Sequence, residues 1–398
     1  MTEKKDYSYL LDVLDFAISE SSKSDNIVNL KLEGDFFSYN NVSKVNRNLF
    51  QVFSRDSNYN LSLSVKDRIN KFDQIYDNLK NFINKPLEST DITITHYSKY
   101  SFMLPEKHWI VYINWDYGSL PNEWIEPLSD YVDQIWVSSN YMKDCFKDSR
   151  IDEEKIKVVN TGVDTLLFNP NITTNIKIPS DKKVKLLYKG NTDWNSGLDI
   201  LLKAYFNEFT YDDDICLVLC IDKINIDRKI DQIIRSFSSN SDDPEIYILD
   251  SNIIPIEENV YKSCDFFVST YRTESYCLEI LESMASGIPV ITNSIGACRD
   301  YCNEDNSIIV KSDIIFESKK EIKGIKTVSF PFWIEPQIND LRVKLRKAYN
   351  LNSNEYQKLS KNASKEILSK YTWIKINSTI KDLIYKLKEQ PIKKRCST

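Results

Sequence analysis

The stretch Glu274-Ser-Tyr-Cys-Leu-Glu-Ile-Leu-Glu-Ser-Met-Ala-Ser-Gly287 follows directly on the strand-like run Asp265-Phe-Phe-Val-Ser-Thr-Tyr271. This order predicts a buried strand, a tight turn and a helix. Glu274 stands at the turn, and Glu282 follows eight residues later within the helix. A helix N-terminus attracts anions through its free N–H groups and its dipole, and a carboxylate accepts hydrogen bonds from hydroxyl groups. The pattern therefore predicts a ligand with phosphate at one end and several hydroxyls at the other, such as a nucleotide-sugar.

The composition excludes several classes of protein. The chain has 398 residues, which suggests two domains of ordinary size. Its net charge of −6 offers no basic footprint for nucleic acid, so we expect no nucleic-acid partner and leave peripheral membrane contact open. No run approaches the roughly 18–20 apolar residues of a membrane helix, and the N-terminus leads to no apolar signal region. These features predict a cytoplasmic protein.

Cysteine and histidine are too scattered to predict a metal site. Eight cysteines occur without a disulfide framework or paired zinc spacing, and the chain has two histidines. Cys298 and Cys302 stand four residues apart, but neither histidine is nearby. We therefore expect reduced structural thiols, with no metal and no other cofactor.

Strand and helix patterns alternate through the N-terminal half, which is typical of parallel α/β layers. Six strands are expected, at residues 27–32, 61–65, 91–96, 109–114, 134–139 and 155–160. Helical patterns cover residues 43–53, 67–83, 121–132 and 140–148, with Asn140 as the expected cap of the last. Residues 161–183 lose this periodicity, and we predict an interdomain linker there.

The alternation restarts at residue 184. Further strands are expected at 184–189, 216–222, 245–250, 265–271 and 289–293, and helices at 197–209, 226–237 and 257–263 in addition to the acidic one. Three helices, at 335–349, 353–369 and 372–388, are expected to close the chain. Each half can form a Rossmann-like sheet of its own, and two facing sheets of this kind bind ligands between the carboxyl ends of their strands.

Several segments share the order and spacing of one enzyme family. They are 119–127 (SLPNEWIEP), 137–141 (VSSNY), 160–170 (NTGVDTLLFNP), 188–197 (YKGNTDWNSG) with 201–206 (LLKAYF), 274–290 with its E-x(7)-E pair and MASGIPV, and 371–373 (YTW). Together they resemble the GT-B glycosyltransferases, specifically the retaining nucleotide-sugar enzymes of glycosyltransferase family 4. The resemblance covers roughly residues 27–390 and is carried by the order of the segments rather than by any one of them.

The resemblance implies an α/β fold of the GT-B kind, with two facing Rossmann-like doubly wound domains. It implies an acceptor-side domain over residues 1–170, a nucleotide-sugar-binding domain over 171–370, and a C-terminal helix within 371–398 that packs back on the first domain. The implied activity is hexosyl transfer from a nucleotide-diphosphate donor to a hydroxyl acceptor, without a metal ion.

By the same resemblance, Glu282 holds the ribose hydroxyls and Glu274 holds the hydroxyls of the donor sugar. The main-chain N–H groups expected to bind the donor phosphate belong to Ser275, Tyr276, Cys277 and Leu278, and the loop residues expected beside the donor are Gly190, Asn191 and Ser196. At 100° per residue, Glu282 lies at the edge of the apolar arc of its helix. An ordinary polar-face glutamate is the alternative, and Glu279, which faces the polar arc more clearly, is interpreted as structural.

Three positions depart from the family pattern. Cys277 stands where glycine is usual, and we interpret it as a tolerated small replacement rather than a catalytic thiol. Asn191 and Ser196 stand where the family has an arginine and a lysine, whose charge-assisted bonds to phosphate contribute about 1.5–3 kcal/mol each. A replacement cation is therefore needed.

Arg272 is the strongest candidate for this cation because it precedes Glu274 by two residues, and we place it among the catalytic residues. Lys189 and Arg299 are further candidates. A solvated arginine without a catalytic role is the alternative for Arg272.

The N-terminal half contributes three further candidates. Gly34 follows the first strand, in a segment that resembles the loop beneath the donor phosphate. Asp116 follows another strand and is our candidate for a catalytic carboxylate that orients the acceptor or stabilises charge. His96 also ends a strand, where it is either a functional group in the cleft or a satisfied structural histidine.

The main hypothesis is retaining transfer of a sugar from a nucleotide donor. The acceptor, whether glycan, lipid or protein, is not identified by the sequence. A second hypothesis is a catalytically inactive GT-B protein that acts as a binding or scaffold subunit, and it rests on Asn191, Ser196 and Cys277. A solute-binding protein shares the two-domain plan, but the acidic pair and the lack of a signal region argue against it.

Overall fold

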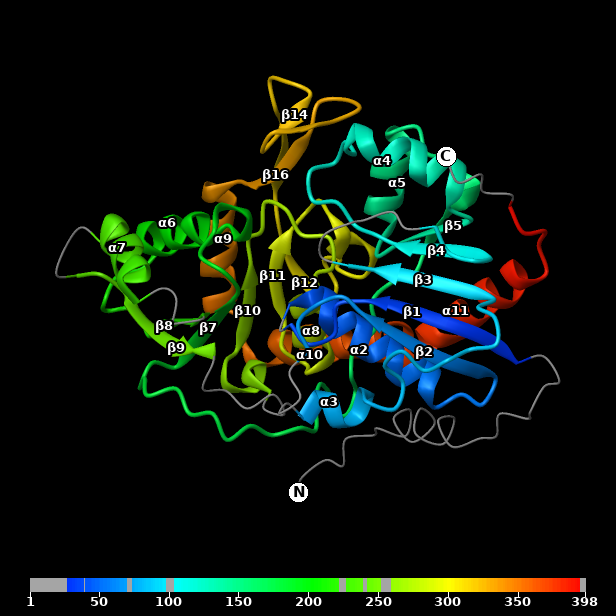
Figure 1. Ribbon diagram of the computed structural model, residues 1–398. Coiled ribbons are helices and arrows are strands. Elements are labelled where there is room, and N and C mark those ends of the chain that lie inside the picture. Colours follow the sequence, from blue (N-terminus) through cyan, green and yellow to red (C-terminus); the bar gives the residue numbers. More distant parts are fainter. Residues whose placement is uncertain are drawn as a thin grey trace.

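The structure is a computed structural model that describes residues 27–38, 40–69, 74–97, 104–221, 227–238, 242–251 and 259–393. Two six-stranded sheets, each flanked by helices, lie beside one another (Figure 1). All the strand pairs within both sheets are parallel. The expected plan of two facing Rossmann-like domains is confirmed.

The N-terminal sheet has the strand order β2-β1-β3-β4-β5-β6. Its strands are β1 (Val28–Gly34), β2 (Tyr59–Val65), β3 (Ile92–His96), β4 (His108–Tyr112), β5 (Gln134–Val137) and β6 (Ile156–Val158). Each of the six overlaps the strand expected from the sequence. The strands β3, β4 and β5 are buried along their whole length, as strands covered on both faces are. β4 and β5 are mostly apolar, whereas β3 alternates isoleucine with threonine.

The C-terminal sheet has the order β12-β11-β10-β7-β8-β9. Its strands are β7 (Val184–Lys189), β8 (Ile215–Ile221), β9 (Glu245–Asp250), β10 (Phe266–Ser269), β11 (Val290–Asn293) and β12 (Ser307–Val310). Five of these were expected, and β12 was not. The central positions of β10 and β7 place the ends of both strands, and the loops that follow them, next to each other.

The helices of the N-terminal domain follow the predicted apolar spacing with two corrections. They are α2 (Asn41–Ser54), α3 (Gln74–Leu79), α4 (Asn122–Glu126), which continues as a π-helical turn (Pro127–Tyr131), and α5 (Asn140–Asp148), with a 3₁₀ turn at Glu153–Lys155. The cap of α5 is Ser139, whose hydroxyl accepts the N–H of Met142, so our assignment of Asn140 was wrong. No helix begins at Asp67, because its carboxylate instead accepts the N–H groups of residues 36–38. Part of the expected helix, residues 70–73, lies outside the described residues.

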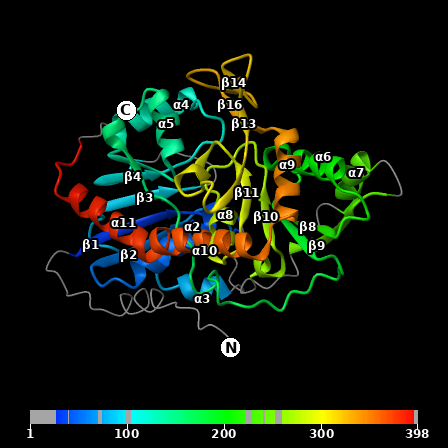
Figure 2. The same ribbon diagram turned by 180° about the vertical axis from the view of Figure 1, so that it is seen from behind.

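The helices of the C-terminal domain include the acidic one. They are α6 (Leu198–Glu208), α7 (Asp227–Phe237), α8 (Leu278–Ala285), α9 (Ile338–Tyr349), α10 (Ser353–Lys370) and α11 (Trp373–Lys388), with 3₁₀ turns at Trp194–Ser196, Val260–Ser263 and Ala297–Asp300. The last of them, α11, returns to the first domain (Figure 2). Its residues Trp373, Ile376, Ile380 and Ile384 belong to the same buried cluster as the core of β1 and β2. The predicted crossing back is therefore confirmed, while the domain limits at 170 and 370 stay predictions.

A pair of ribbons between β12 and α9 was missed. It contains β13 (Ser312–Phe316), β14 (Glu321–Ile322), β15 (Ile325–Lys326) and β16 (Phe332–Pro336). We call residues 312–336 the arm, because they project above the two domains in Figure 1. Glu335, the expected start of a helix, pairs with Asp313 in this ribbon, and the helix begins at Ile338.

Within the described part of the chain, every helix is too short or too polar to cross a membrane. The cytoplasmic location stays a prediction.

Candidate functional site

The turn before α8 holds Cys277 in an unusual backbone conformation. Its φ angle is 53°, in the left-handed region, and it is 1% exposed. A residue with a Cβ pays roughly 1–2 kcal/mol there, and glycine does not. Glycine adopts this conformation without strain. This gives a second reason for the glycine in the family pattern, in addition to the close approach of phosphate that we inferred. Burial raises the pKa of the Cys277 thiol well above its usual value, which agrees with a replacement residue rather than a nucleophile.

Glu274 folds back on the turn that it opens. Its Oε1 accepts the N–H of Tyr276 at 2.9 Å and the N–H of Cys277 at 3.1 Å. Burial, with the negative charges of Glu279 and Asp116 nearby, raises the pKa of Glu274 to about 8. The Glu274 carboxyl group therefore occupies two of the N–H groups that we expected to bind phosphate, and it is mostly protonated at neutral pH.

Glu282 lies deeper on the same helix and is 3% exposed. It accepts a hydrogen bond from the hydroxyl of Tyr261 at 2.9 Å and forms ion pairs with Lys189, at 3.5 Å, and with Lys44. Burial opposes its charge, but the two lysines hold the pKa of Glu282 below its usual value. The alternative of an ordinary polar-face glutamate is therefore wrong.

The two lysines around Glu282 come from different domains. Lys189 ends β7 of the C-terminal sheet, whereas Lys44 lies in the first turn of α2 in the N-terminal domain. Burial disfavours a charged Lys189, yet the carboxylates of Glu282 and Glu279 hold its pKa above the usual value. The Lys44 side chain is 35% exposed and passes over the ring of Phe168, with Nζ 5.3 Å from the ring centroid.

Lys44 and Tyr261 were missed in the sequence. Lys44 did carry a signal, because a cation in the first turn of a helix opposes the helix dipole and has no structural advantage there. Its position just beyond β1, at the carboxyl edge of the sheet, is also where ligand-binding groups gather. Tyr261 lies in a short 3₁₀ turn and carried no signal.

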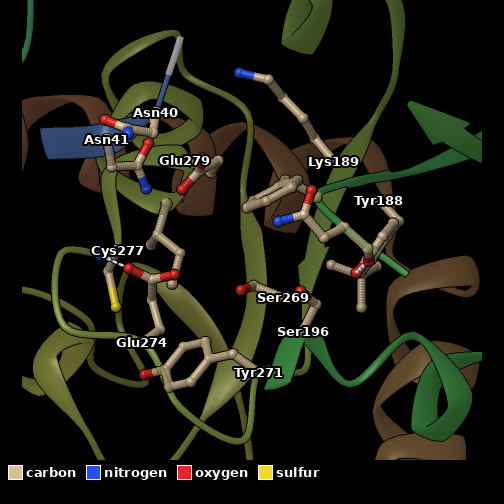
Figure 3. Close-up of a pocket in the computed structure, with 15 residues that line it drawn as sticks. Asn40, Asn41, Tyr188, Lys189, Ser196, Ser269, Tyr271, Glu274, Cys277 and Glu279 are labelled. Atoms are coloured by element: carbon tan, nitrogen blue, oxygen red, sulfur yellow. Dashed lines mark hydrogen bonds between the residues drawn. The ribbon is translucent and has the colours of Figure 1, made fainter. Parts of the chain in front are cut away.

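A cavity of about 340 Å³ opens beside α8 (Figure 3). It is lined by Asn40, Asn41, Tyr188, Lys189, Gly190, Asn191, Ser196, Phe267, Val268, Ser269, Tyr271, Glu274, Cys277, Glu279 and Ile280. In Figure 3, Glu274 and Cys277 lie on one side of the cavity, Tyr188 and Ser196 lie on the other, and the Lys189 side chain extends away from both. The cavity thus brings together residues from both domains.

The structure gathers part of the predicted site around this cavity. Gly190, Asn191, Ser196, Glu274 and Cys277 line it, and so does Glu279, which we had interpreted as structural. The other predicted residues are not among its described lining residues: Gly34, Asp116, Arg272, Ser275, Tyr276, Leu278 and Glu282. Whether any of these groups contacts a donor stays a prediction.

Gly197 fixes the loop that carries Asn191 and Ser196. Its φ angle is 70°, and a Cβ at this position would come within 1.8 Å of the carbonyl oxygen of Thr270. The loop after β7 therefore lies directly against the chain that leaves β10. Only glycine permits this approach, which accounts for its presence in a chain with 8 glycines.

Ser275 connects the two domains. Its hydroxyl donates to the Asp116 carboxylate, and its carbonyl oxygen accepts the hydroxyl of Ser138. Desolvation by the surrounding protein raises the pKa of Asp116, although the residue keeps an exposed face, and the Ser275 hydrogen bond and the charge of Lys323 in the arm oppose that increase. Asp116 therefore lies at the domain boundary, as expected of an acceptor-side carboxylate, but its bond to Ser275 was not anticipated.

Tyr276 and Leu278 also reach into the N-terminal domain. The Tyr276 hydroxyl lies 2.7 Å from Nε2 of His96, whose Nδ1 lies 2.7 Å from Oδ1 of Asn46. Burial lowers the pKa of His96 to about 3, so its ring is neutral. Leu278 belongs to the buried cluster of the N-terminal domain. These contacts favour the structural interpretation of His96.

Gly34 has a packing role at the same boundary. A Cβ at this position would lie 2.3 Å from the carbonyl oxygen of His96 and 2.5 Å from Nδ2 of Asn46. The glycine is required by these neighbours whether or not a donor phosphate lies above it.

Arg272 does not supply a free cation to the cavity. Its guanidinium pairs with Asp199 at 2.8 Å and with Glu335 at 2.7 Å, and its side chain is 6% exposed. Burial opposes the charge of Arg272, but these two carboxylates hold its pKa above the usual value. The alternative of a solvated arginine is wrong, and the geometry favours a structural role over the catalytic one that we assigned. Arg299 donates to the carbonyl oxygen of Ser294. Among the residues that the structure describes, Lys44 and Lys189 are the cations paired with Glu282.

The described cysteines are all free and buried, and Cys396 lies outside the described residues. In the described ranges, no three side chains of His, Cys, Asp or Glu group closely enough to hold a metal ion. Metal independence stays a prediction.

Comparison with known proteins agrees with the architecture. Residues 183–322 match the family described as Glycosyl transferases group 1. The structure of Anabaena Alr3699/HepE in complex with UDP and glucose superposes with a TM-score of 0.65 at 11% identity, over 90% of this chain and 100% of that one. Sucrose-phosphate synthase from Thermosynechococcus elongatus gives 0.61 at 13% identity, over 90% and 99%.

A curated relative in sequence is the alpha-monoglucosyldiacylglycerol synthase of Streptococcus pneumoniae. It is 26% identical over 172 residues, which cover 41% of this chain and 37% of that protein. The matched part therefore spans little more than a third of the relative's length.

The two facing parallel sheets and these superpositions define the fold as that of the GT-B glycosyltransferases. More narrowly, the match to the Glycosyl transferases group 1 family covers residues 183–322, which include α8 and the loop after β7.

Proposed function

We propose that this protein transfers a sugar from a nucleotide-diphosphate donor to a hydroxyl acceptor, with retention of anomeric configuration. The observation that carries the proposal is the placement of Glu274, Glu279 and Lys189 around a cavity to which both domains contribute, with Glu282 paired to Lys189. HepE, which shares the fold, was crystallised with UDP and glucose, and this favours a UDP-sugar donor.

In this proposal the nucleoside replaces Lys44 on Glu282. The buried, ionised Glu282 accepts hydrogen bonds from the two ribose hydroxyls, and Tyr261 holds the carboxylate in place. Lys44 is then released from Glu282, and its ammonium group, together with that of Lys189, serves the donor diphosphate. They substitute for the arginine and lysine whose positions Asn191 and Ser196 occupy.

Glu274 is suited to the sugar end of the donor. With a pKa raised to about 8, it is a neutral group at pH 7 and does not repel an incoming diphosphate. A protonated carboxyl group both donates and accepts hydrogen bonds, so it fits a sugar hydroxyl. When the donor binds, the N–H groups of Tyr276 and Cys277 no longer donate to Glu274 and donate to phosphate oxygens instead.

The reaction needs no covalent nucleophile. The bond between the anomeric carbon and the leaving diphosphate oxygen breaks, and the acceptor oxygen forms a bond to that carbon on the same face. The acceptor proton passes to the leaving diphosphate oxygen. Asp116, at the domain boundary, orients the acceptor hydroxyl, and positioned charges stabilise the departing diphosphate.

A membrane lipid is our proposed class of acceptor, because the curated relative is named for synthesis of a glucosylated diacylglycerol.

The first test of the proposed function is a screen of possible donors. UDP-, GDP- and ADP-sugars are added to the protein, and thermal stabilisation and nucleotide release are measured. With the donor that responds, Glu282→Gln is expected to lower turnover at least about 100-fold, since it removes a charged acceptor from the ribose site. Glu304→Gln, which changes the charge of an exposed glutamate in the same domain, is the control and should retain wild-type turnover.

Full turnover in Glu282→Gln would contradict the donor-site assignment. Because this variant leaves two lysines without their carboxylate, its melting curve without ligand is measured in parallel to establish that it is folded.

An inactive scaffold is the second candidate, and one observation favours it. Both acidic groups of the site are already satisfied within the protein, Glu274 by main-chain N–H groups and Glu282 by Lys44, Lys189 and Tyr261. If no nucleotide or nucleotide-sugar in the screen stabilises the protein, the transfer proposal is rejected and the scaffold stands.

A further inference from the structure

The arm, residues 312–336, is an antiparallel ribbon with a second small hairpin at its tip. In β13 and β16, Ser312 pairs with Pro336 and Phe316 pairs with Phe332. The tip turns at Lys323 and Gly324, whose φ angles of 50° and 80° fit a tight two-residue hairpin turn. The base of the arm packs into the C-terminal core through Ile334, and its outer part projects at the junction of the two domains (Figures 1 and 2).

The arm exposes large apolar side chains that a two-stranded ribbon has no means to bury. Its exposed apolar residues are Ile314 (41%), Ile315 (38%), Phe316 (61%), Ile325 (36%) and Phe330 (44%). Single exposed apolar residues are ordinary, but a group of five on one short ribbon is typical of a contact surface.

The tip is basic although the chain as a whole is acidic. Residues 318–330 contain four lysines (319, 320, 323 and 326) and one acidic residue, Glu321, a net charge of +3 in a chain of net charge −6. The other acidic residues of the arm, Asp313, Glu317 and Glu335, lie nearer its base, so the positive charge is confined to the tip. Lysine and apolar groups are interleaved, and Nζ of Lys320 lies 5.7 Å from the ring centroid of Phe330. Long lysine stems beside aromatic rings are suited to a boundary between water and an apolar phase.

The arm is fixed in place by the N-terminal domain. The N–H of Phe332 donates to the carbonyl oxygen of Tyr117 at 3.0 Å, and the N–H of Val328 donates to that of Leu120 at 3.0 Å. Lys323 lies over the Tyr117 ring, 5.0 Å from its centroid, and its charge acts on Asp116. The exposed surface of the arm is therefore held beside the carboxylate proposed to orient the acceptor.

We propose that the arm docks this protein on an anionic membrane surface. Lys319, Lys320 and Lys326 at its tip contact acidic headgroups, and the exposed isoleucine and phenylalanine side chains enter the boundary between headgroups and acyl chains. A protein partner is disfavoured by the same composition, because lysine is depleted from protein–protein interfaces, whereas each lysine near an anionic bilayer adds attraction.

Docking through the arm would bring Asp116, on which Lys323 of the arm acts, towards the bilayer. If the proposed function holds, the arm delivers the Asp116 side of the site to a hydroxyl on a membrane lipid. The docking itself needs no donor and no catalysis, so it can fail or succeed independently of glycosyl transfer.

The test is co-sedimentation of the full chain, without nucleotide, with vesicles of phosphatidylcholine alone or with about 30 mol% phosphatidylglycerol. The wild type is expected to bind the anionic vesicles, to bind neutral ones much more weakly, and to be released at about 0.5 M salt. Two arm variants are compared: Lys319→Glu with Lys320→Glu, and Ile314→Ser with Phe316→Ser. Each is expected to weaken vesicle binding about tenfold or more.

The matched control is Lys358→Glu with Lys361→Glu, which makes the same charge change at two exposed positions of α10. It should bind vesicles at least half as tightly as the wild type. The proposal is overturned if the control loses as much binding as the lysine variant of the arm, or if the arm variants bind like the wild type.

The alternative partner of the arm is a second copy of the chain, which would pair with the edge of β13 that does not face β16. Light scattering of the wild type decides this: a dimer that Ile314→Ser with Phe316→Ser converts to a monomer, together with no vesicle binding, overturns the membrane proposal. Since all the substituted side chains are exposed, loss of folding is not expected, and melting curves check it.

Discussion

The beginning and the middle of α8 place two glutamates in opposite surroundings. Just before the beginning, Glu274 accepts two main-chain N–H groups and has further carboxyl groups nearby, and burial raises its pKa to about 8. In the middle, Glu282 is more deeply buried, yet two lysines and a tyrosine hold its pKa below the usual value. One carboxyl group is therefore mostly neutral and the other fully charged at pH 7.

The difference shows that burial alone does not decide the charge of an acid; the partners that the fold brings to it do. For Glu282 one such partner, Lys44, is 238 positions away in the chain and in the other domain. The pair suits a ligand with two ends, because the charged acid accepts ribose hydroxyls and the neutral acid tolerates a nearby diphosphate.

Replacing Lys44 tests the charged half of this comparison and has the largest expected effect. In Lys44→Met, the nucleoside diphosphate that responds in the donor screen should bind about 10–100-fold more weakly, since a charge-assisted bond of about 1.5–3 kcal/mol is lost. The corresponding nucleoside, which lacks phosphate, should bind as in the wild type or more tightly, because Glu282 no longer pairs with Lys44. Calorimetric titration measures both.

Lys66→Met is the matched control. Lys66 has the same 35% side-chain exposure as Lys44 and also pairs with a buried glutamate, Glu33, but on the N-terminal sheet. Equal weakening of nucleoside and diphosphate in Lys44→Met would mean that Lys44 acts only through Glu282 and not on phosphate.

Replacing Arg272 tests the surroundings of the neutral Glu274. Arg272 is two residues away in the sequence, but it pairs with Asp199 and Glu335 instead of Glu274. Arg272→Met should lower the free energy of unfolding by about 1–3 kcal/mol, in the lower part of that range since Asp199 is 46% exposed and regains water. Turnover measured below the melting temperature should stay within about threefold of the wild type.

Chemical denaturation measures this loss, with Arg346→Met as the control. Arg346 likewise pairs with two carboxylates, Glu208 and Asp213, but is 32% exposed and should cost less. A fall in turnover of 100-fold or more in folded Arg272→Met would restore the catalytic role that the sequence suggested.

The fold was predictable because it depends on local periodicity. Each strand that the alternation predicted, from β1 through β11, is present, and α11 packs where the resemblance placed it. The arm escaped prediction for a physical reason. Asp313, Ile314, Ile315 and Phe316 are all exposed on a two-stranded ribbon, so they carry no in–out alternation that a pattern could reveal.

The two acidic residues of the site could be predicted from the sequence, but the groups that contact them could not. The spacing of Glu274 and Glu282 follows from one helix, which a sequence displays directly. Lys44, Tyr261 and the bond between Ser275 and Asp116 depend on the way two domains meet, and no local pattern encodes that meeting. Arg272 was misjudged for the same reason, since Asp199 and Glu335 reach it from distant segments.

Glu274→Gln tests the neutral half of the comparison. The folded pKa of Glu274 is about 8 against an ordinary value of 4.5, so between these pH values the folded state holds a proton that the unfolded state lacks. Wild-type stability should therefore fall as pH rises through this window, and the glutamine variant lacks that decrease. The melting temperature of Glu274→Gln should exceed that of the wild type by on the order of 2–4 °C at about pH 8.5, and by little at about pH 5.

Differential scanning calorimetry across this pH range measures the difference in melting temperature between Glu274→Gln and the wild type. Glu304→Gln, at an exposed position, should show no such widening with pH. A constant gap for Glu274→Gln would mean that Glu274 is ionised in the folded protein, and the contrast with Glu282 would disappear.

The smallest expected effect concerns the backbone beneath the neutral acid. At Cys277, with φ of 53°, glycine relieves strain that alanine retains, so Cys277→Gly should be more stable than Cys277→Ala by about 1 kcal/mol. Cys145, buried within α5, gives the opposite order, because glycine in a helix is about 1 kcal/mol worse than alanine. Urea midpoints of the four variants measure both differences. If alanine were the more stable residue at both positions, the turn would be unstrained, and the left-handed turn that offers its N–H groups to Glu274 would need another explanation.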